Sequence, residues 1–306
     1  MTDGYALVIG SMGIEVKAYA PPPLGAINAG TVRNSLGGGA RNIAENLARL
    51  DVATTLLSAV SVDGTGRRVI RWMRKVGVDC RHVRVVPDGR TANFVSFINE
   101  HGEPTMTIYD TSIMENIDSN YLWKHEPLIA KAALLVIDAT LNEEALATAF
   151  EIAERYSVRV CADPTAPTLA GKLRPHLAQL YLLTPNAAEA TALCAMTPVD
   201  RESALDAARK LVALGAKIAV VTMGEIGVAY AHSSGSGFIR AKATQVIDPT
   251  GAGDAFTGAV IFGLLNHVSE DEAMRLGMTA AALTLQCNGS VFPGLTQELL
   301  YDKLVV

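Results

Sequence analysis

Short apolar runs alternate with amphipathic stretches along most of the chain. The runs are rich in Val, Ile, Leu and Ala, which is typical of strands buried on both faces of a parallel sheet. They occupy residues 6–9, 54–60, 134–138, 158–164, 181–183 and 218–222. Between them, apolar residues recur three and four positions apart, as at Val69, Met73 and Val76, and this spacing predicts helices. The alternation predicts an α/β fold with a doubly wound, mainly parallel sheet flanked by helices.

Two regions depart from this alternation. Residues 12–35 contain three consecutive prolines, Pro21 to Pro23, and scattered glycines, so this region cannot be a helix. In residues 91–109, two runs with alternating side chains, one through Phe94, Ser96 and Ile98 and one through Met106 and Ile108, flank a polar turn at 101–103, which predicts a hairpin. Together they indicate a small antiparallel sheet beside the main domain. A hairpin on the edge of the main sheet fits the pattern equally well.

Composition and charge narrow the class of protein. A chain of 306 residues can form one large α/β domain. Its formal net charge is −5, and no Lys/Arg run is longer than Arg67-Arg68, so a nucleic-acid-binding surface is not expected. Four widely spaced cysteines favour neither disulfides nor a zinc site, which suggests the cytoplasm. A leader or an apolar stretch long enough to span a membrane is not evident, so no membrane partner is expected.

The most informative stretch is residues 248–256, with the sequence D-P-T-G-A-G-D-A-F. Gly251, Ala252 and Gly253 lead into an apolar segment, which predicts a glycine turn at a helix N-terminus. Unpaired backbone N–H groups and the helix dipole can bind a phosphate there. Asp254 falls in the first turn, where a carboxylate can accept a proton from an attacking hydroxyl. A simple helix start with an N-terminal Asp is the alternative for a bare G-x-G-D.

The whole string resembles the C-terminal signature of the ribokinase-like (PfkB-type) carbohydrate kinases. The resemblance implies an ATP-dependent kinase that requires Mg²⁺, in which Asp254 is the base and residues 251–253 stabilise the transferring phosphoryl group. It also implies that Asp248 and Thr250 help to form a monovalent-cation site, for K⁺, as in some members. In this family, a lid made by regions equivalent to 12–35 and 91–112 closes over the sugar, which favours the lid arrangement within a single domain spanning residues 1–306.

A second glycine-rich stretch, Gly37-Gly38-Gly39, precedes another predicted helix. Three glycines allow the backbone to approach a polar ligand closely, although a loose turn would also explain them. The stretch resembles the N-terminal signature of the same family. By that resemblance, Gly38, Gly39 and Asn42 bind sugar hydroxyls.

Two further motifs have a structural and a functional interpretation. Asn186 and Glu189 form an N-x-x-E pattern that by itself predicts a helix N-cap with its capping-box partner. In the family, this motif orders Mg²⁺ and the nucleotide phosphates, often through water. The glycines of Thr222-x-Gly224-x-x-Gly227 suit a hairpin, and in the family this segment lines the nucleotide site.

The remaining motifs say less about function. Asp138 and Asp163 end predicted strands, and we expect each to cap the following turn and not to be catalytic. Walker A and protein-kinase motifs do not occur, so the kinase prediction depends on residues 251–254.

The acceptor is less constrained than the chemistry. Residues 41–50, 57–60 and 109–113 resemble the pseudouridine kinase branch of the family most. Relatives typically have Asn and, two residues later, Asp after the first strand, where they bind ribose hydroxyls; this chain has Gly13 and Glu15. Ribose, adenosine, fructose and ketodeoxygluconate therefore stay open as acceptors, with Glu15 among the residues expected to bind them. A sensor that binds nucleotide or sugar without catalysis is the alternative from another class, and a homodimer through the lid is expected by analogy.

Overall fold

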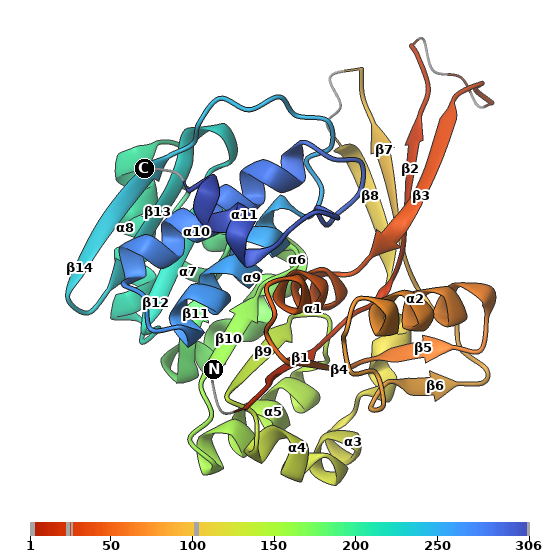
Figure 1. Ribbon diagram of the computed structural model, residues 1–306, viewed down its shortest axis with the longest axis horizontal. Coiled ribbons are helices and arrows are strands. Elements are labelled where there is room, and N and C mark those ends of the chain that lie inside the picture. The colour runs from red at the N-terminus through yellow and green to blue at the C-terminus, as the bar shows by residue number, and fades with distance from the viewer. Residues whose placement is uncertain (1–3, 23–24, 26, 101–103, 305–306) are drawn as a thin grey trace.

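The computed structural model describes residues 4–22, 25, 27–100 and 104–304, and its largest element is an eight-stranded sheet (Figure 1). The strands follow the order β14-β13-β12-β11-β10-β9-β1-β4. Every pair from β12 to β4 is parallel, and β13 and β14 add an antiparallel edge. The strands are β1 (Ala6–Ile9), β4 (Thr54–Leu57), β9 (Leu134–Asp138), β10 (Val160–Asp163), β11 (Leu180–Leu183), β12 (Ile218–Thr222), β13 (Gly227–His232) and β14 (Gly235–Arg240).

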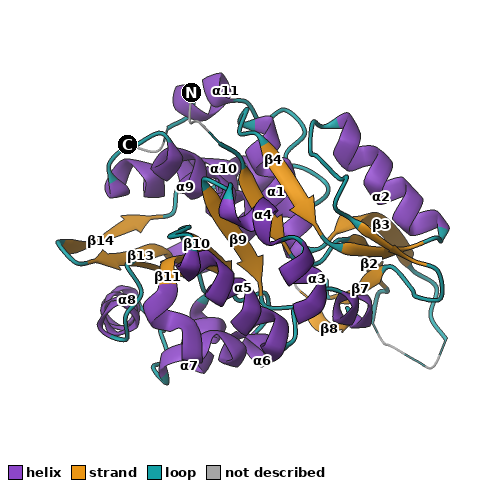
Figure 2. Cartoon of the chain, turned by 90° about the horizontal axis from the view of Figure 1, so that it is seen from below, coloured by secondary structure: helices purple, strands orange, loops and turns teal. Residues whose placement is uncertain are grey.

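Helices cover both faces of this sheet, as Figure 2 shows in a view from below. The α-helices are α1 (Gly39–Arg49), α2 (Gly64–Lys75), α3 (Ser119–Lys124), α4 (Glu126–Ala130), α5 (Glu143–Arg155), α6 (Pro167–Ala170), α7 (Ala187–Cys194), α8 (Arg201–Ala213), α9 (Ala252–Leu265), α10 (Glu270–Leu285) and α11 (Gln297–Asp302). The 3₁₀ segments are η1 (Ser112–Asn116), η2 (Gly171–Gln179) and η3 (Gly224–Ile226).

Alternate residues of the central strand β1 enter different cores. Leu7 and Ile9 belong to the cluster that contains Phe150 of α5. Ala6 and Val8 belong to the cluster beneath α1 and α9. All four β1 side chains are essentially inaccessible to solvent, as expected for a strand between two helical layers. The predicted doubly wound α/β fold is confirmed.

A second sheet of four strands projects from the main body, and we call it the lid sheet. Its order is β3-β2-β7-β8, with β2 (Gly13–Tyr19), β3 (Thr31–Gly37), β7 (Ala92–Ile98) and β8 (Pro104–Asp110). The hairpin partners β2/β3 and β7/β8 are antiparallel, and a parallel β2/β7 pair joins them. The two irregular regions of the sequence therefore form one separate sheet and not an edge of the main sheet. The predicted turn at 101–103 lies outside the described residues.

The predicted strand at 54–60 divides into two. β4 ends at Leu57 in the main sheet, and β5 (Ala59–Ser61) pairs in parallel with β6 (Arg84–Val86) in a separate two-stranded sheet. Ser58 lies at the break and donates a hydrogen bond from its buried hydroxyl to the carbonyl of Gly10 (2.5 Å). A continuous apolar run cannot reveal this division because the partners of both strands come from distant parts of the chain. In the part of the chain that the structure describes, no helix has the length and apolar character needed to cross a bilayer.

Candidate active site

The N-terminus of α9 lies in a tight glycine turn. Gly251 is the N-cap and has φ 78°, a left-handed conformation that favours glycine. A Cβ at Gly251 would lie 1.9 Å from the carbonyl oxygen of Ser290, so the turn and the segment around Ser290 exclude any side chain here. Gly253 differs, because a Cβ there would meet no atom within 4 Å. The turn therefore leaves the first N–H groups of a 14-residue helix facing open space, as an anion site requires.

Asp254 lies in the first turn of α9 and is partly buried. The pKa of its carboxyl is raised to about 7, mainly by burial and in smaller part by the charges of Asp138 and Glu15; the hydrogen bond from Asn42 and the charge of Arg41 oppose this rise. A carboxylate with a pKa near neutral pH is well suited to accept a proton from a hydroxyl.

A chain of side-chain hydrogen bonds orients this carboxylate. The Nδ2 of Asn42 donates to Oδ2 of Asp254 (2.6 Å). The Oδ1 of Asn42 accepts from the guanidinium of Arg41 and from the hydroxyl of Ser290 (3.1 Å). Arg41 is itself 3% exposed and paired with buried Glu45 (2.6 Å). By the family resemblance Asn42 is expected to bind sugar hydroxyls; in the structure its amide binds the predicted base.

The glycine-rich stretch before α1 brings backbone close to Asp254. Gly38 has φ 101°, and a Cβ there would lie 2.5 Å from the carbonyl oxygen of Ser11. A Cβ at Gly39 would lie 3.5 Å from Oδ1 of Asp254. Glycine at position 39 thus leaves space directly beside the carboxylate, where an acceptor hydroxyl could approach.

Glu15 projects from β2 of the lid sheet toward the same region. Its side chain is buried, which raises its pKa, and its Oε2 lies 3.4 Å from the hydroxyl of Ser35 on β3. Gly13 lies two residues before Glu15, on the same face of β2. It has no room for a side chain because a Cβ would lie 1.9 Å from the carbonyl oxygen of Ala92 on β7. The close pairing of β2 and β7 therefore accounts for the glycine at that position.

Asp138 has a structural role, as predicted. Its buried carboxylate accepts hydrogen bonds from the backbone and hydroxyl of Ser11 (2.7 and 2.9 Å), from the backbone of Ala40 (3.3 Å) and from that of Thr140 (3.0 Å). The residue holds the end of β1 against the start of α1 as well as capping its own turn. Asp163 likewise accepts from the backbone of Thr165 (2.7 Å).

Asn186 and Glu189 form a complete capping box at the start of α7. Asn186 Oδ1 accepts from the backbone of Glu189 (3.0 Å), and Glu189 Oε2 accepts from the backbone of Asn186 (2.9 Å). Burial nevertheless raises the pKa of Glu189 above its usual value. The pKa of Asp163 is raised well above its ordinary range by burial and by the negative charges of Asp254, Glu189 and Asp138. Three neighbouring carboxyl groups therefore disfavour the ionised form of Asp163.

The acidic groups fit a hydrated divalent cation better than a directly ligated one. No cluster of three or more His, Cys, Asp or Glu ligands occurs in the described ranges, so direct coordination by such a set is not offered there. Mg²⁺ usually keeps several waters, and one or two carboxylates suffice to hold it beside phosphates. Glu189 and Asp163 are the residues that would hold it.

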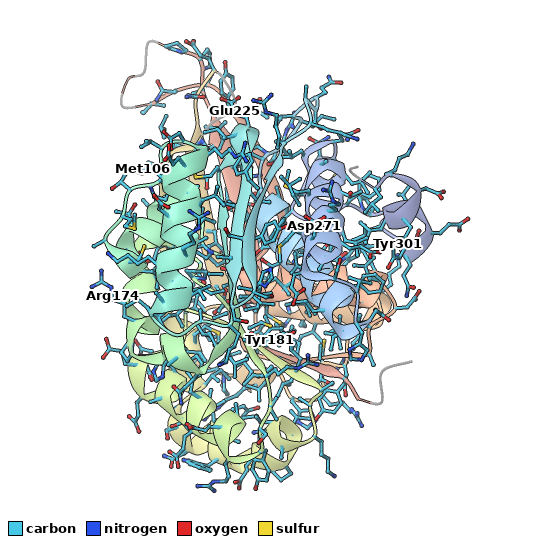
Figure 3. The ribbon with its side chains drawn as sticks, turned by 90° about the vertical axis from the view of Figure 1, so that its left-hand side faces the viewer. Met106, Arg174, Tyr181, Glu225, Asp271 and Tyr301 are labelled. Atoms are coloured by element: carbon cyan, nitrogen blue, oxygen red, sulfur yellow. The ribbon has the colours of Figure 1, made fainter. Side chains whose placement is uncertain are left out.

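A separate apolar pocket brings together three of the five predicted nucleotide-binding residues, without Asn186 and Glu189. Thr222, Gly224, Gly227 and Gly253 are among the residues that line it. Its volume is about 230 Å³, and its remaining lining comes mainly from α9, α10 and the segment 241–249. The hydroxyl of Tyr230 on β13 donates to Asp271 on α10 (2.6 Å), and Figure 3 labels Asp271 on this helix. The pocket lies beside the glycine turn, since Ala252 and Gly253 are part of its lining.

The predicted cation residue Asp248 has a partner that no local sequence pattern predicts. The ammonium of Lys17, on β2, lies 2.5 and 2.6 Å from the two carboxylate oxygens of Asp248. The backbone of Thr250 also donates to Oδ1 of Asp248 (3.0 Å). A cavity of about 820 Å³ extends from this pair between the lid sheet and residues 247–250. The polar side chains of Lys17 and Ser35 are in its wall.

Comparison with known proteins agrees with this geometry. Residues 3–297 match the model of the pfkB family carbohydrate kinases. The chain belongs to this family. The pseudouridine kinase of Escherichia coli (strain K12) is 32% identical over 295 residues, which cover 95% of this chain and 94% of the relative. The guanosine-inosine kinase of Exiguobacterium acetylicum is 30% identical over 309 residues, which cover 96% and 97%. The protein is accordingly a phosphotransferase of the sugar and nucleoside kinase class.

Solved structures share the fold of this kinase. The Arabidopsis thaliana ribokinase, determined with ribose and ATP, superposes with a TM-score of 0.83 at 22% identity, over 97% of this chain and 98% of the ribokinase. The fold prediction and the family resemblance read from residues 248–256 are thus both confirmed.

Proposed function

We propose that the kinase transfers the γ-phosphoryl group of ATP to the primary hydroxyl of a nucleoside or sugar, with pseudouridine as the first candidate. The observation that carries this proposal is the state of Asp254. Its carboxyl lies in the first turn of α9, accepts a hydrogen bond from Asn42 and has a pKa of about 7, as a base for a hydroxyl requires. A pfkB-type sensor would not need such a base.

The chemistry follows from this arrangement. The acceptor hydroxyl approaches Asp254 through the space that Gly39 leaves, and its proton passes to the carboxylate as the oxygen attacks the γ-phosphorus. The bond from phosphorus to the β–γ bridging oxygen breaks, and the bond electrons leave with ADP. The N–H groups of the turn at Gly251 stabilise the charge on the transferring group. Mg²⁺, when bound, supplies further positive charge on the phosphates.

Each substrate has a matching surface. We assign the nucleotide base to the apolar pocket lined by Thr222, Gly224 and Gly227. We assign the acceptor to the region between Glu15 and Asp254, since Glu15, Asn42 and the backbone of Gly38 and Gly39 supply polar groups there. Pseudouridine is favoured by the 32% identity to the Escherichia coli pseudouridine kinase. Guanosine and inosine are the second candidates, because the guanosine-inosine kinase is 30% identical.

An acceptor panel tests this proposal. ATP turnover with Mg²⁺ is measured on pseudouridine, uridine, guanosine, inosine, adenosine, ribose, fructose and ketodeoxygluconate, and the products are identified by mass spectrometry. We expect selective formation of a pseudouridine monophosphate. Activity on another acceptor alone would keep the kinase and reject pseudouridine. Binding of these ligands without turnover of any would reject the kinase in favour of a sensor.

We further propose that the protein works in the cytoplasm, because its four cysteines are free thiols. We also propose that two copies associate through the outer face of the lid sheet. The strand register pairs Val95 with Ile108 and Phe97 with Met106 on the outer face. Glu15 and Lys17 lie on the other face of the same sheet. Phe97, Met106 and Ile108 are 41%, 50% and 57% exposed, which is unusual for adjacent large apolar side chains. Light scattering should give a dimer for the wild type and a monomer for Ile108→Glu; a monomeric wild type would reject the proposal.

A further inference from the structure

The carboxylate of Asp248 is already saturated with donors in this protein. The ammonium of Lys17 contacts both of its oxygens, at 2.5 and 2.6 Å. The backbone N–H groups of Thr250 and Gly289 donate to Oδ1 and Oδ2, at 3.0 and 3.4 Å. A metal cation would need these same oxygens as ligands, and it would have to bind beside a like charge. The residues present therefore do not fit a K⁺ ion at Asp248.

The ion pair between Lys17 and Asp248 is largely shielded from solvent. The side chains of Lys17 and Asp248 are 15% and 14% exposed, so solvent screens their attraction only partly. Burial raises the pKa of Asp248, but the hydrogen bonds from Lys17 and Thr250 outweigh it and lower the pKa below its usual value. The carboxylate is thus held in its charged form by a fixed positive group.

This positive group lies next to the phosphoryl site. Asp248 and Thr250 immediately precede Gly251, whose turn begins α9. The segment 285–290 packs on the other side, because Ile247 bonds to the carbonyl of Leu285 (2.8 Å) and a Cβ at Gly251 would strike Ser290. A cation at Asp248 would neutralise its charge and fix the shape of the turn that binds the anion.

From these observations, and on the basis of the proposed kinase function, we propose that the Lys17 ammonium is the built-in cation of this site. The ammonium neutralises Asp248 and fixes the glycine turn, as a bound monovalent ion would, so catalysis does not require K⁺. Lys17 is a positioning residue in this proposal: it acts through Asp248 and the glycine turn. Because Lys17 lies on β2, the positive charge beside Asp248 belongs to the lid sheet and is not taken up from solution.

Lys17→Ala tests the proposal, since it removes the ammonium and leaves room for an ion. Activity and thermal unfolding are measured in tetramethylammonium chloride, with K⁺ replacing it at constant ionic strength. The wild type should change less than about twofold on addition of K⁺. Lys17→Ala should lose at least about tenfold in activity without K⁺, as expected when a shielded carboxylate loses its partner, and should recover with saturable dependence on K⁺. Lys17→Arg should stay unresponsive.

The melting temperature gives a readout that needs no turnover. K⁺ should raise the melting temperature of Lys17→Ala and leave that of the wild type and of Lys210→Ala unchanged; Lys210 is an exposed lysine on α8. The proposal is overturned if K⁺ strongly activates or stabilises the wild type, or if Lys17→Ala shows no K⁺ response in either measurement. If no acceptor is phosphorylated, the kinase proposal fails while the melting data still decide the role of Lys17.

Discussion

At the scale of single residues, the ionisation of Asp254 controls the proposed chemistry. Burial raises its pKa to about 7, and Asn42 opposes this rise by donating a hydrogen bond to the ionised form. The reaction requires the ionised base, so kcat/KM should rise with pH through a midpoint at about pH 7 and level off at higher pH.

Asn42→Ala should move that pH profile. Without the hydrogen bond, the pKa of Asp254 in the free enzyme rises, so the midpoint of kcat/KM shifts to higher pH even if the variant also binds acceptor less tightly. The measurement is kcat/KM between weakly acidic and alkaline pH. Asn266→Ala, at the other end of α9, is the matched control and should keep the wild-type midpoint. An unchanged or lowered midpoint in Asn42→Ala would show that Asn42 does not tune the base.

The sequence predicted some of these residues and not others, for physical reasons. Asp254 and Asn42 lie in local patterns that imply their positions on helices. The contacts of Lys17 with Asp248 and of Arg41 with Ser290 join residues 231 and 249 positions apart. No local pattern encodes such contacts, because they depend on how the lid sheet and the segment 285–290 pack on the main sheet.

At the scale of elements, the start of α9 separates two roles of glycine. Gly251 is required by its left-handed backbone and by the carbonyl of Ser290. Gly253 has ordinary helical geometry and faces the nucleotide pocket, so its role is to leave space there.

Two alanine variants should therefore fail differently. Gly251→Ala should lower the free energy of unfolding by about 2–6 kcal/mol, from backbone strain together with overpacking. Gly253→Ala should leave it unchanged or raise it by about 0.5–1 kcal/mol, as in other helices, but reduce kcat/KM for ATP by about 10- to 100-fold. Denaturant unfolding and steady-state kinetics measure both. Equal stability of the two variants would contradict the account of the turn.

The order of elements was largely predictable, since apolar runs and helical spacing recur along the chain. The exception is the run at 54–60, which the structure divides at Ser58 between two sheets. Apolar runs specify burial but not the partner strand, so the division was not visible in the sequence.

At the scale of the whole molecule, the site lies where three parts meet. The main sheet carries α1 and α9, the lid sheet supplies Glu15 and Lys17, and the segment 285–290 supports the turn at Gly251. The inner face of the lid sheet is polar toward the cavity, and its outer face is apolar. The sequence predicted this sheet from its two irregular regions, but only the fold shows which face of it lies toward the site.

The central claim is that Asp254 is the base for phosphoryl transfer to an acceptor hydroxyl. It is tested most directly by comparing wild type and Asp254→Asn on the best acceptor of the panel, with binding of ATP and acceptor measured by calorimetry on the same samples. We predict a fall in kcat of about 10²–10⁴-fold with both ligands still bound. An Asp254→Asn variant that turns over at the wild-type rate would contradict the account.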